Sequence, residues 1–305
     1  MRCAFLLVFL VFSFTCRSNH IEKDSLSNHQ NRKLTVAGIS TAVLYSSSMY
    51  LLYQTWYKDY SSSKFQLFND LNEWKGMDKI GHVTTSLFIA QWLQSVQEIG
   101  GLNDRNKNLR SVLVPMAFMT TIEVFDGFST GWGFSVSDLA ANTIGLGIFY
   151  AQNKLFEDQR LLLKYSFNAS PYASFRPNLL GKSYAEQMLK DYNGQTYWIT
   201  YPISNLWPKK NNQLPKWLCL SVGYGVDGLI GARSNVWVNQ QQKFDLSLIP
   251  RSHEWYLSFD IDLKKIPIRG KAWQLFSSAI RWIKIPAPTL YYNRNAGFKA
   301  LPIHW

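Results

Sequence analysis

The sequence predicts an α+β protein, in which a membrane-associated module of four helices precedes a C-terminal part with a small antiparallel β-sheet and one or two helices. Up to Phe156 the chain consists of long uncharged runs separated by polar turns, and beyond Pro215 apolar and polar residues alternate with a period of two. A hydrophobic content of 47%, with 12 Trp, 16 Tyr and 19 Phe, supplies a core or a membrane-contacting surface and excludes general disorder.

Residues 1–18 are predicted to be a signal peptide. Arg2 provides a short positive region, and residues 4–14 form an apolar stretch too short to span a bilayer. Cys16 follows a segment that resembles a bacterial lipoprotein cleavage site, although Phe14 and Thr15 match the small residues of such sites poorly. We therefore favour an ordinary signal peptide, with lipidation at Cys16 as the alternative. Removal of the segment after Cys16 would leave Cys219 as the single thiol, excluding an internal disulfide and a cysteine-based metal site.

A polar tether is expected at residues 19–33, followed by a helical module at 34–156. Residues 34–56 carry no charge, and 23 helical residues extend about 35 Å, so this run is the transmembrane prediction. Its serines and threonines make the run only moderately hydrophobic, so a buried helix of a helical bundle is the alternative. Three shorter apolar helices are expected at 80–97, 109–125 and 136–155, as a compact bundle or as half-inserted helices.

Residues 157–305 are predicted to form a C-terminal extension that contains β-strands. A short helix is expected at 183–191, strands at 218–226 and 255–263, and a helix face at 272–283. Leu301, Ile303 and Trp305 are in phase for a last strand, and a terminal aromatic residue is typical of outer-membrane barrels. The three or four expected strands are too few for such a barrel, which favours a small sheet packed on the helices or on a membrane surface.

A group of polar side chains interrupts the most apolar stretches and forms a candidate site. Its members are Asp78, Lys79, His82, Glu123, Asp126, Asp138 and Asn142. On helices, residues three or four apart share a face, so three helices can direct polar pairs at one another. The four carboxylates exceed the positive charge of Lys79 and His82. We therefore expect a bound cation, protonated acids or access of water.

Three interpretations of this polar centre remain open. A divalent metal suits His82 and the carboxylates, although the spacing matches no established motif. Acid–base chemistry on a lipid-linked or cell-wall substrate is a second interpretation, with His82 and Glu123 or Asp126 as the reacting groups. In the third, the residues form a structural network that ties helices together. The sequence identifies no cofactor.

The chain carries 32 Lys and Arg against 20 Asp and Glu, a net charge of +12. This excess favours membrane lipid or another anionic envelope component as partner. An aromatic chain behind an export signal argues against nucleic acid, and no protein partner is indicated. We expect an exported, membrane-associated envelope protein, on the outer membrane or the periplasmic face in preference to the inner membrane.

Several motifs resemble an uncharacterised family of bacterial predicted periplasmic lipoproteins with a domain of unknown function. They are Met77-Asp78-Lys79-Ile80-Gly81-His82, Glu123-Val124-Phe125-Asp126-Gly127 and Asp138-Leu139-Ala140-Ala141-Asn142. The stretch Glu186 to Trp198 and the strand around Ser221 are similar to a longer form found in Bacteroidetes. The order of Asp78, Lys79, His82, Glu123, Asp138 and Asn142 is also distantly similar to the VanZ family. These resemblances imply an envelope protein but supply no reaction.

The expected function is binding or organisation of a lipid or cell-wall-linked component at the polar centre. The alternatives are a membrane-associated enzyme that uses the same residues and a structural envelope scaffold that uses its basic, aromatic C-terminal surface.

Overall fold

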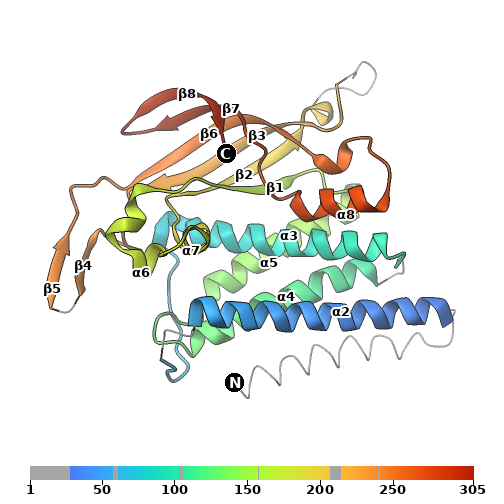
Figure 1. Ribbon diagram of the computed structural model, residues 1–305, viewed down its shortest axis with the longest axis horizontal. Helices are drawn as coiled ribbons and strands as arrows, with labels where there is room; N and C mark the ends of the chain where they lie inside the picture. Colours follow the sequence, from blue (N-terminus) through green and yellow to red (C-terminus); the bar gives the residue numbers. More distant parts are fainter. Residues whose placement is uncertain (1–27, 58–60, 103–105, 157, 207–213, 240) are drawn as a thin grey trace.

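The computed structural model describes residues 28–57, 61–102, 106–156, 158–206, 214–239 and 241–305. The predicted signal peptide and Cys16 lie outside these residues. The described chain is α+β, with helices in its N-terminal half and an antiparallel sheet in its C-terminal half, which confirms the predicted class. Figure 1 shows the sheet stacked on a helical layer, with α3 next to the sheet and α2 on the far side.

Four long helices form the helical layer: α2 Asn28–Leu52, α3 Met77–Ile99, α4 Lys107–Gly127 and α5 Val136–Phe156. The helix α2 begins inside the expected tether, because residues 28–33 are helical, and a π-helical turn, Tyr53–Tyr57, follows it. Within the described chain, Arg32–Leu52 is the one segment whose length and apolar composition suffice to cross a membrane. Transmembrane insertion stays a prediction.

The helices α3 and α5 pack most closely. Leu87, Ala90, Leu146 and Phe149 form their buried core. Gly145 makes the approach possible, since a Cβ there would lie 2.3 Å from the backbone oxygen of Val83. The helix α2 is attached more loosely, through the ring of Tyr45, whose hydroxyl hydrogen-bonds to Thr121 of α4 at 2.5 Å.

The sheet has six strands in the order β1-β2-β3-β6-β7-β8, and every neighbouring pair is antiparallel. The strands are β1 Leu162–Phe167, β2 Gln195–Pro202, β3 Leu218–Asp227, β6 Ser252–Ile261, β7 Ala287–Asn293 and β8 Gly297–His304. A separate hairpin joins β4 Val236–Asn239 to β5 Gln242–Asp245. The expectation of three or four strands was therefore too low, and β2 occupies a segment that the sequence did not mark as a strand.

Short helices surround the sheet. They are α6 Pro177–Leu180, α7 Tyr184–Lys190 and α8 Lys271–Ile280, with 3₁₀ turns at Glu73–Gly76, Pro171–Phe175, Ile203–Asn205 and Leu263–Lys265. The helix expected at 183–191 is α7, whose first turn is capped by the Ser183 hydroxyl. The expected helix at 272–283 is α8, which ends three residues earlier than predicted.

One face of the sheet is polar and buried. Lys164 and Asp260 form an ion pair at 3.0 Å with both side chains inaccessible, and the hydroxyls of Thr200 and Ser221 hydrogen-bond at 2.7 Å. Cys219 of β3 lies on the same face and is also fully buried.

The end of the chain covers part of this polar face. His304 stacks on Tyr256 with ring centroids 4.9 Å apart, and the Asn168 amide donates to the Trp305 carbonyl at 3.4 Å.

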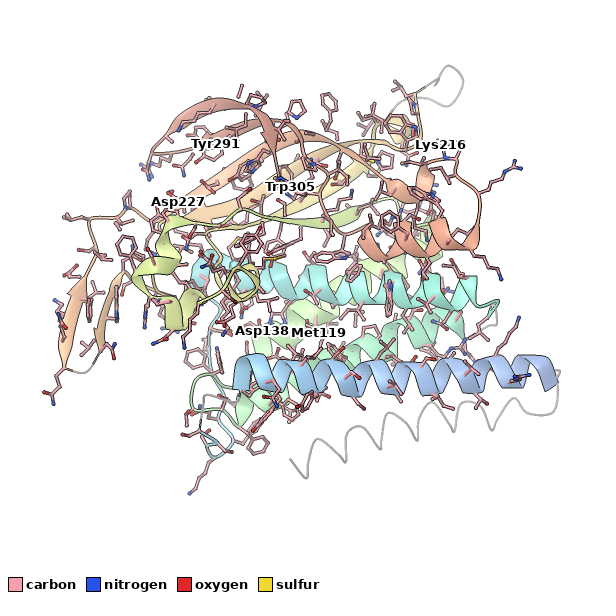
Figure 2. All side chains as sticks on the ribbon, viewed as in Figure 1. Met119, Asp138, Lys216, Asp227, Tyr291 and Trp305 are labelled. Atoms are coloured by element: carbon pink, nitrogen blue, oxygen red, sulfur yellow. The ribbon has the colours of Figure 1, made fainter. Side chains whose placement is uncertain are left out.

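Figure 2 shows side chains filling the space between the sheet and the helical layer.

Candidate functional site

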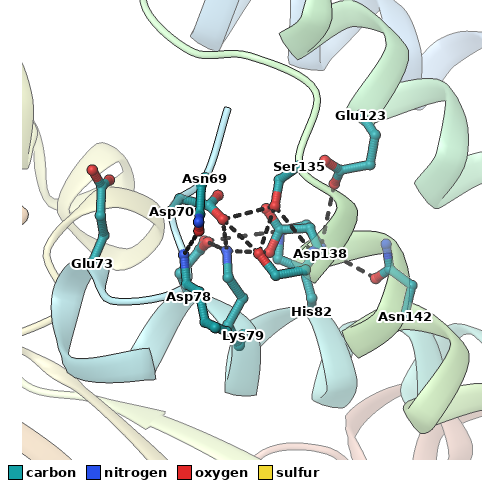
Figure 3. Close-up of polar contacts among 12 residues, drawn as sticks. Asn69, Asp70, Glu73, Asp78, Lys79, His82, Glu123, Ser135, Asp138 and Asn142 are labelled. Carbon is teal, nitrogen blue, oxygen red and sulfur yellow. Dashed lines mark hydrogen bonds and ion pairs between the residues drawn. The ribbon is translucent and has the colours of Figure 1, made fainter. Parts of the chain in front are cut away.

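Three helices and one loop build the polar centre. The first two turns of α3 carry Asp78, Lys79 and His82, the first two turns of α5 carry Asp138 and Asn142, and the last turns of α4 carry Glu123 and Asp126. Figure 3 shows the side chains from α3, α4 and α5 directed at one another, with Asp70 approaching from the loop before α3. The predicted convergence of polar residues is thus present in the structure.

Lys79 forms ion pairs with three acids on one side of the centre. Its ammonium group contacts the carboxylates of Asp70 at 2.7 Å, Asp78 at 2.8 Å and Asp138 at 2.5 Å. These contacts outweigh the effect of burial and raise the pKa of Lys79, which is therefore charged at neutral pH. One positive charge is shared by three acids.

Two serines fix the loop and the start of α5. The hydroxyls of Ser135 and Ser137 both donate to Oδ1 of Asp70 at 2.7 Å. The Ser135 hydroxyl also accepts from the backbone N–H of Asp138 at 3.1 Å and so caps the start of this helix. Burial acts to raise the pKa of Asp70, but the hydrogen bonds from Lys79 and the two serines lower it to about 2.

His82 occupies the middle of the centre. Its Nδ1 lies 3.1 Å from Oδ1 of Asn142, an amide oxygen that can only accept, so this contact places a proton on Nδ1. Its Nε2 lies 3.8 Å from Oδ1 of Asp78 and 3.7 Å from Oδ1 of Asp138. The side chain is 17% exposed and the Asp78 side chain 22%, so solvent reaches this edge of the centre.

Glu123 lies deeper, on the other side of His82. Its Oε1 is 3.6 Å from Nδ1 of His82, its side chain is 1% exposed, and neither carboxylate oxygen makes a hydrogen bond of ordinary geometry with a described residue. Burial, helped by the charges of Asp138 and Asp126, raises the pKa of Glu123 to about 9, against a small opposing effect of the Ser135 backbone N–H. Glu123 is therefore a neutral acid at pH 7.

The remaining acids titrate differently from one another. Burial raises the pKa of Asp126 to about 7, although the Tyr57 hydroxyl donates to it at 2.8 Å. Asp126 lies at the margin, since its hydrogen bond is to Tyr57 while the other members reach it only electrostatically. Burial and the charge of Asp78 raise the pKa of Asp138 to about 7. For Asp78, the effect of burial is exceeded by His82 and Lys79, and the pKa is lowered.

The centre contains a set of atoms able to hold a metal ion. One ligand atom each from Asp78, His82 and Asp138 lie within 4.8 Å of one another. Imidazole nitrogen and carboxylate oxygen are ligands for divalent ions such as Zn²⁺ and Mn²⁺. A cation would also offset the negative charge of Asp70, Asp78 and Asp138, three carboxylates that share the single positive charge of Lys79.

Residues from outside the three helices complete the centre. The Tyr192 hydroxyl donates to Oδ1 of Asp78 at 2.7 Å, Tyr57 follows α2, and Asp70 belongs to the loop before α3. The centre predicted from the sequence did not include Asp70 or either tyrosine. Their position depends on tertiary packing, for which the local pattern holds no signal.

Residues 67–154 match the model of a family described as predicted periplasmic lipoprotein (DUF2279). This match confirms the resemblance to that family over most of the helical module, including every predicted residue of the polar centre. No curated protein and no solved structure matches the chain. The similarities to the VanZ family and to a Bacteroidetes form stay predictions.

Proposed function

We propose, from the match of residues 67–154 to predicted periplasmic lipoproteins, that the chain is an exported envelope protein that binds a lipid or cell-wall-linked component at the polar centre. A divalent cation is the part of this complex that the protein holds directly. The observation that carries the proposal is the approach of Asp78, His82 and Asp138 to within 4.8 Å, at ligand atoms.

Each residue of the centre has a distinct role in this proposal. His82 binds through Nε2, because Asn142 holds the proton on Nδ1 and orients the ring. Asp78 and Asp138 supply oxygen ligands, and Lys79 keeps the two carboxylates together while it leaves the centre negative overall. Three protein ligands leave further coordination positions open.

The open positions lie toward solvent, at the edge where His82 and Asp78 are partly exposed. A phosphate or carboxylate of an envelope component can complete the coordination of a divalent ion there. The family description is consistent with a location in the envelope, where such components occur.

A second function is acid–base chemistry, which one specific observation favours. Glu123 holds its proton at neutral pH and lies 3.6 Å from His82, so a neutral acid and an imidazole form adjacent parts of one site. In that case Glu123→Gln abolishes turnover of an envelope substrate but leaves cation binding intact. Loss of cation binding in the His82 and Asp138 variants, with no turnover of an envelope substrate by the wild type, supports the binding function.

The test is a titration of the chelator-treated, folded protein with Mn²⁺, Zn²⁺, Mg²⁺ and Ca²⁺. Calorimetry measures the binding of each ion, and electron paramagnetic resonance measures the binding of Mn²⁺. We expect one site per chain and at least a tenfold loss of affinity in His82→Ala and in Asp138→Asn. Asp158→Asn is the control, because Asp158 pairs with Lys265 away from the centre and carries the same charge change.

Absence of stoichiometric binding by the folded wild type would overturn the cation proposal. If Asp138→Asn then also unfolds at lower temperature than the control variant, the residues form a structural network. If it does not, the centre has neither role.

A further inference from the structure

The register of the sheet aligns apolar side chains into continuous rows on one face. Paired residues across all six strands form an aromatic row, which consists of Tyr165, Tyr197, Tyr224, Trp255, Tyr292 and Phe298. Two residues further along the strands lies an aliphatic row, which consists of Leu163, Ile199, Val222, Leu257, Leu290 and Ala300. We call this surface the apolar face.

Other parts of the protein cover the apolar face on β1 and at one end of β2 and β3, where Tyr197, Tyr224 and Val226 pack around Met77 of α3. Leu163 packs against the core of α3 and α5, and Tyr165 lies on Trp282 with ring centroids 5.8 Å apart. The aliphatic row is open from Ile199 onward, with Val222 47% and Leu290 56% exposed, and the aromatic row is open at its far end, where Phe298 is 83% exposed. Phe259 and Trp255 of β6 are also about half exposed.

The distribution of polarity across the sheet is reversed from that of a water-soluble protein. The covered face holds Lys164, Asp260 and a row of hydroxyl side chains, Thr200, Ser221, Ser258 and Thr289, while the uncovered face is apolar. Exposure of such a surface to water is unfavourable, whereas contact with hydrocarbon removes the apolar area from water and is favourable. Aromatic residues next to aliphatic ones are typical of proteins at a membrane interface.

A basic cavity adjoins the aromatic row. It has a volume of about 770 Å³ and is lined by Lys75, Pro250, Arg251, Ser252, His253, Trp255, Tyr292, Arg294 and Asn295. Among the described residues, no carboxylate contributes to this lining. Arg251 is held by the carbonyls of Gly231 and Ala232 at 2.5 and 2.8 Å, so its charge is not neutralised by these contacts.

Lys75 is held in place at the rim of this cavity. Its backbone has the left-handed conformation, φ 54°, and the Tyr224 hydroxyl donates to its carbonyl at 3.0 Å. Its ammonium group lies 3.2 Å from Nε2 of His253. A residue other than glycine adopts this backbone conformation only where surrounding contacts impose it, and here the result is a second cation beside Arg251.

We propose that the apolar face lies against an anionic lipid bilayer and that the basic cavity binds a lipid phosphate. The adjoining aromatic and aliphatic rows then contact the headgroup region and the acyl chains. The charge of the cavity selects anionic lipid. This surface is separate from the polar centre, and the inference does not rest on cation binding there.

The test uses the full chain in proteoliposomes, with a nitroxide attached at Leu257→Cys on the apolar face. A matched label at Val238→Cys lies on the exposed β4–β5 hairpin. In vesicles that contain phosphatidylglycerol, we expect the Leu257 label to become accessible to oxygen and protected from a water-soluble nickel reagent by at least about fivefold. The Val238 label should remain open to the nickel reagent.

The variant Lys75→Gln/Arg294→Gln tests the cavity. We expect it to reduce the protection at Leu257 at least about threefold in anionic vesicles and to make it equal to that in phosphatidylcholine vesicles. Lys243→Gln/Lys271→Gln removes the same charge at exposed positions elsewhere and should retain the wild-type protection.

Equal nickel access at both labelled sites in anionic vesicles would overturn the lipid proposal. Protection at Leu257 that is already present without vesicles and rises with protein concentration would also overturn it, because a second copy of the chain would then cover the face. If protection persists in the Lys75 and Arg294 variant, the cavity does not bind the lipid phosphate. Circular dichroism verifies that every variant is folded.

Discussion

Glu123 is the residue whose surroundings differ most from those of an ordinary glutamate. An ionised carboxylate is stabilised by water or by hydrogen-bond donors. Burial removes water from Glu123, and hydrogen-bond donors are nearly absent around it. The proton on Glu123 is therefore part of the folded state. Consequently, the free energy of unfolding should depend on pH in a range where few carboxylic acids titrate.

Replacement of Glu123 by Gln should increase stability at alkaline pH. The folded-state pKa of about 9 lies above the ordinary value of 4.5, so the wild type loses stability as pH rises from 4.5 through 9, and an amide cannot ionise. In metal-free buffer at pH 8 we expect the variant to be more stable by at least about 1.4 kcal/mol, the equivalent of one pKa unit. Thermal melts between pH 5 and 9 measure this.

The exposed Glu98→Gln provides the comparison, since Glu98 pairs with Lys107 at the surface. Parallel melting curves for wild type and Glu123→Gln across this pH range would show that Glu123 is ionised in the folded protein.

Lys79→Gln should expose the repulsion among the three acids that Lys79 contacts. Removal of one partner from a buried charge cluster destabilises by about 3–5 kcal/mol. Under the proposed function, millimolar Mn²⁺ should restore part of this loss, because a dication replaces the ammonium group. Melting temperatures with and without Mn²⁺ test this, with Lys107→Gln as control. A loss that Mn²⁺ leaves unchanged contradicts a cation site.

At the scale of elements, the contact between α3 and α5 sets the geometry of the centre, because His82 and Asn142 belong to these two helices. Gly145 fixes their separation through its missing side chain. Gly147 of the same helix has open space around its Cβ position. The two glycines therefore form a matched pair.

Gly145→Ala should destabilise the protein by about 1–3 kcal/mol, because the added methyl group meets the backbone of Val83 and the Ser86 hydroxyl. Gly147→Ala should stabilise it by up to about 1 kcal/mol through helix propensity. Chemical denaturation measures both changes. Equal effects of the two substitutions would mean that the helices are not in close contact at Gly145.

Helix positions were predictable from the sequence, whereas the sheet was largely not. The long helices are uncharged runs with polar ends, and the expected 80–97 and 109–125 lie within Met77–Ile99 and Lys107–Gly127. In β2, Tyr197, Trp198 and Tyr201 occupy both faces and obscure the alternation. The alternation of apolar and polar residues in β3 and β6 was visible in the sequence. It did not indicate which side is buried, and in the structure the polar side is the buried one.

The same distinction applies to the polar centre. Helical spacing predicts that Asp78 and His82, or Asp138 and Asn142, share a face, and their helices bring them together. Asp70, Tyr57 and Tyr192 come from loops or from distant segments. Only the packing of the whole chain places them, so no local pattern predicts their contribution.

At the scale of the whole molecule, the helical layer and the sheet share contacts at the polar centre. Tyr192 donates to Asp78, and Met77 packs in one buried cluster with Val226 and Leu229 beyond the helical module. A Cβ on Gly81 would meet the Tyr197 hydroxyl at 2.9 Å. The two predicted parts of the chain, 34–156 and 157–305, therefore pack against each other, and the boundary between them stays a prediction.

We expect a single unfolding transition that includes both halves. Tyr192→Phe should lower the free energy of unfolding by about 1–3 kcal/mol through loss of the hydrogen bond to the Asp78 carboxylate, without splitting the transition. Calorimetry together with tryptophan fluorescence measures the midpoint and the number of transitions. Two separate transitions in the wild type would show that the layers fold independently.

The reactivity of the buried Cys219 thiol provides a measure of how often the sheet opens. Burial raises its pKa to about 11, and the side chain is inaccessible between neighbouring strands, so a thiol reagent reacts with it only after the strands separate. The rate of modification then reports how often the sheet opens. Measured in detergent and in vesicles, this rate would show how each environment changes the lifetime of the closed sheet.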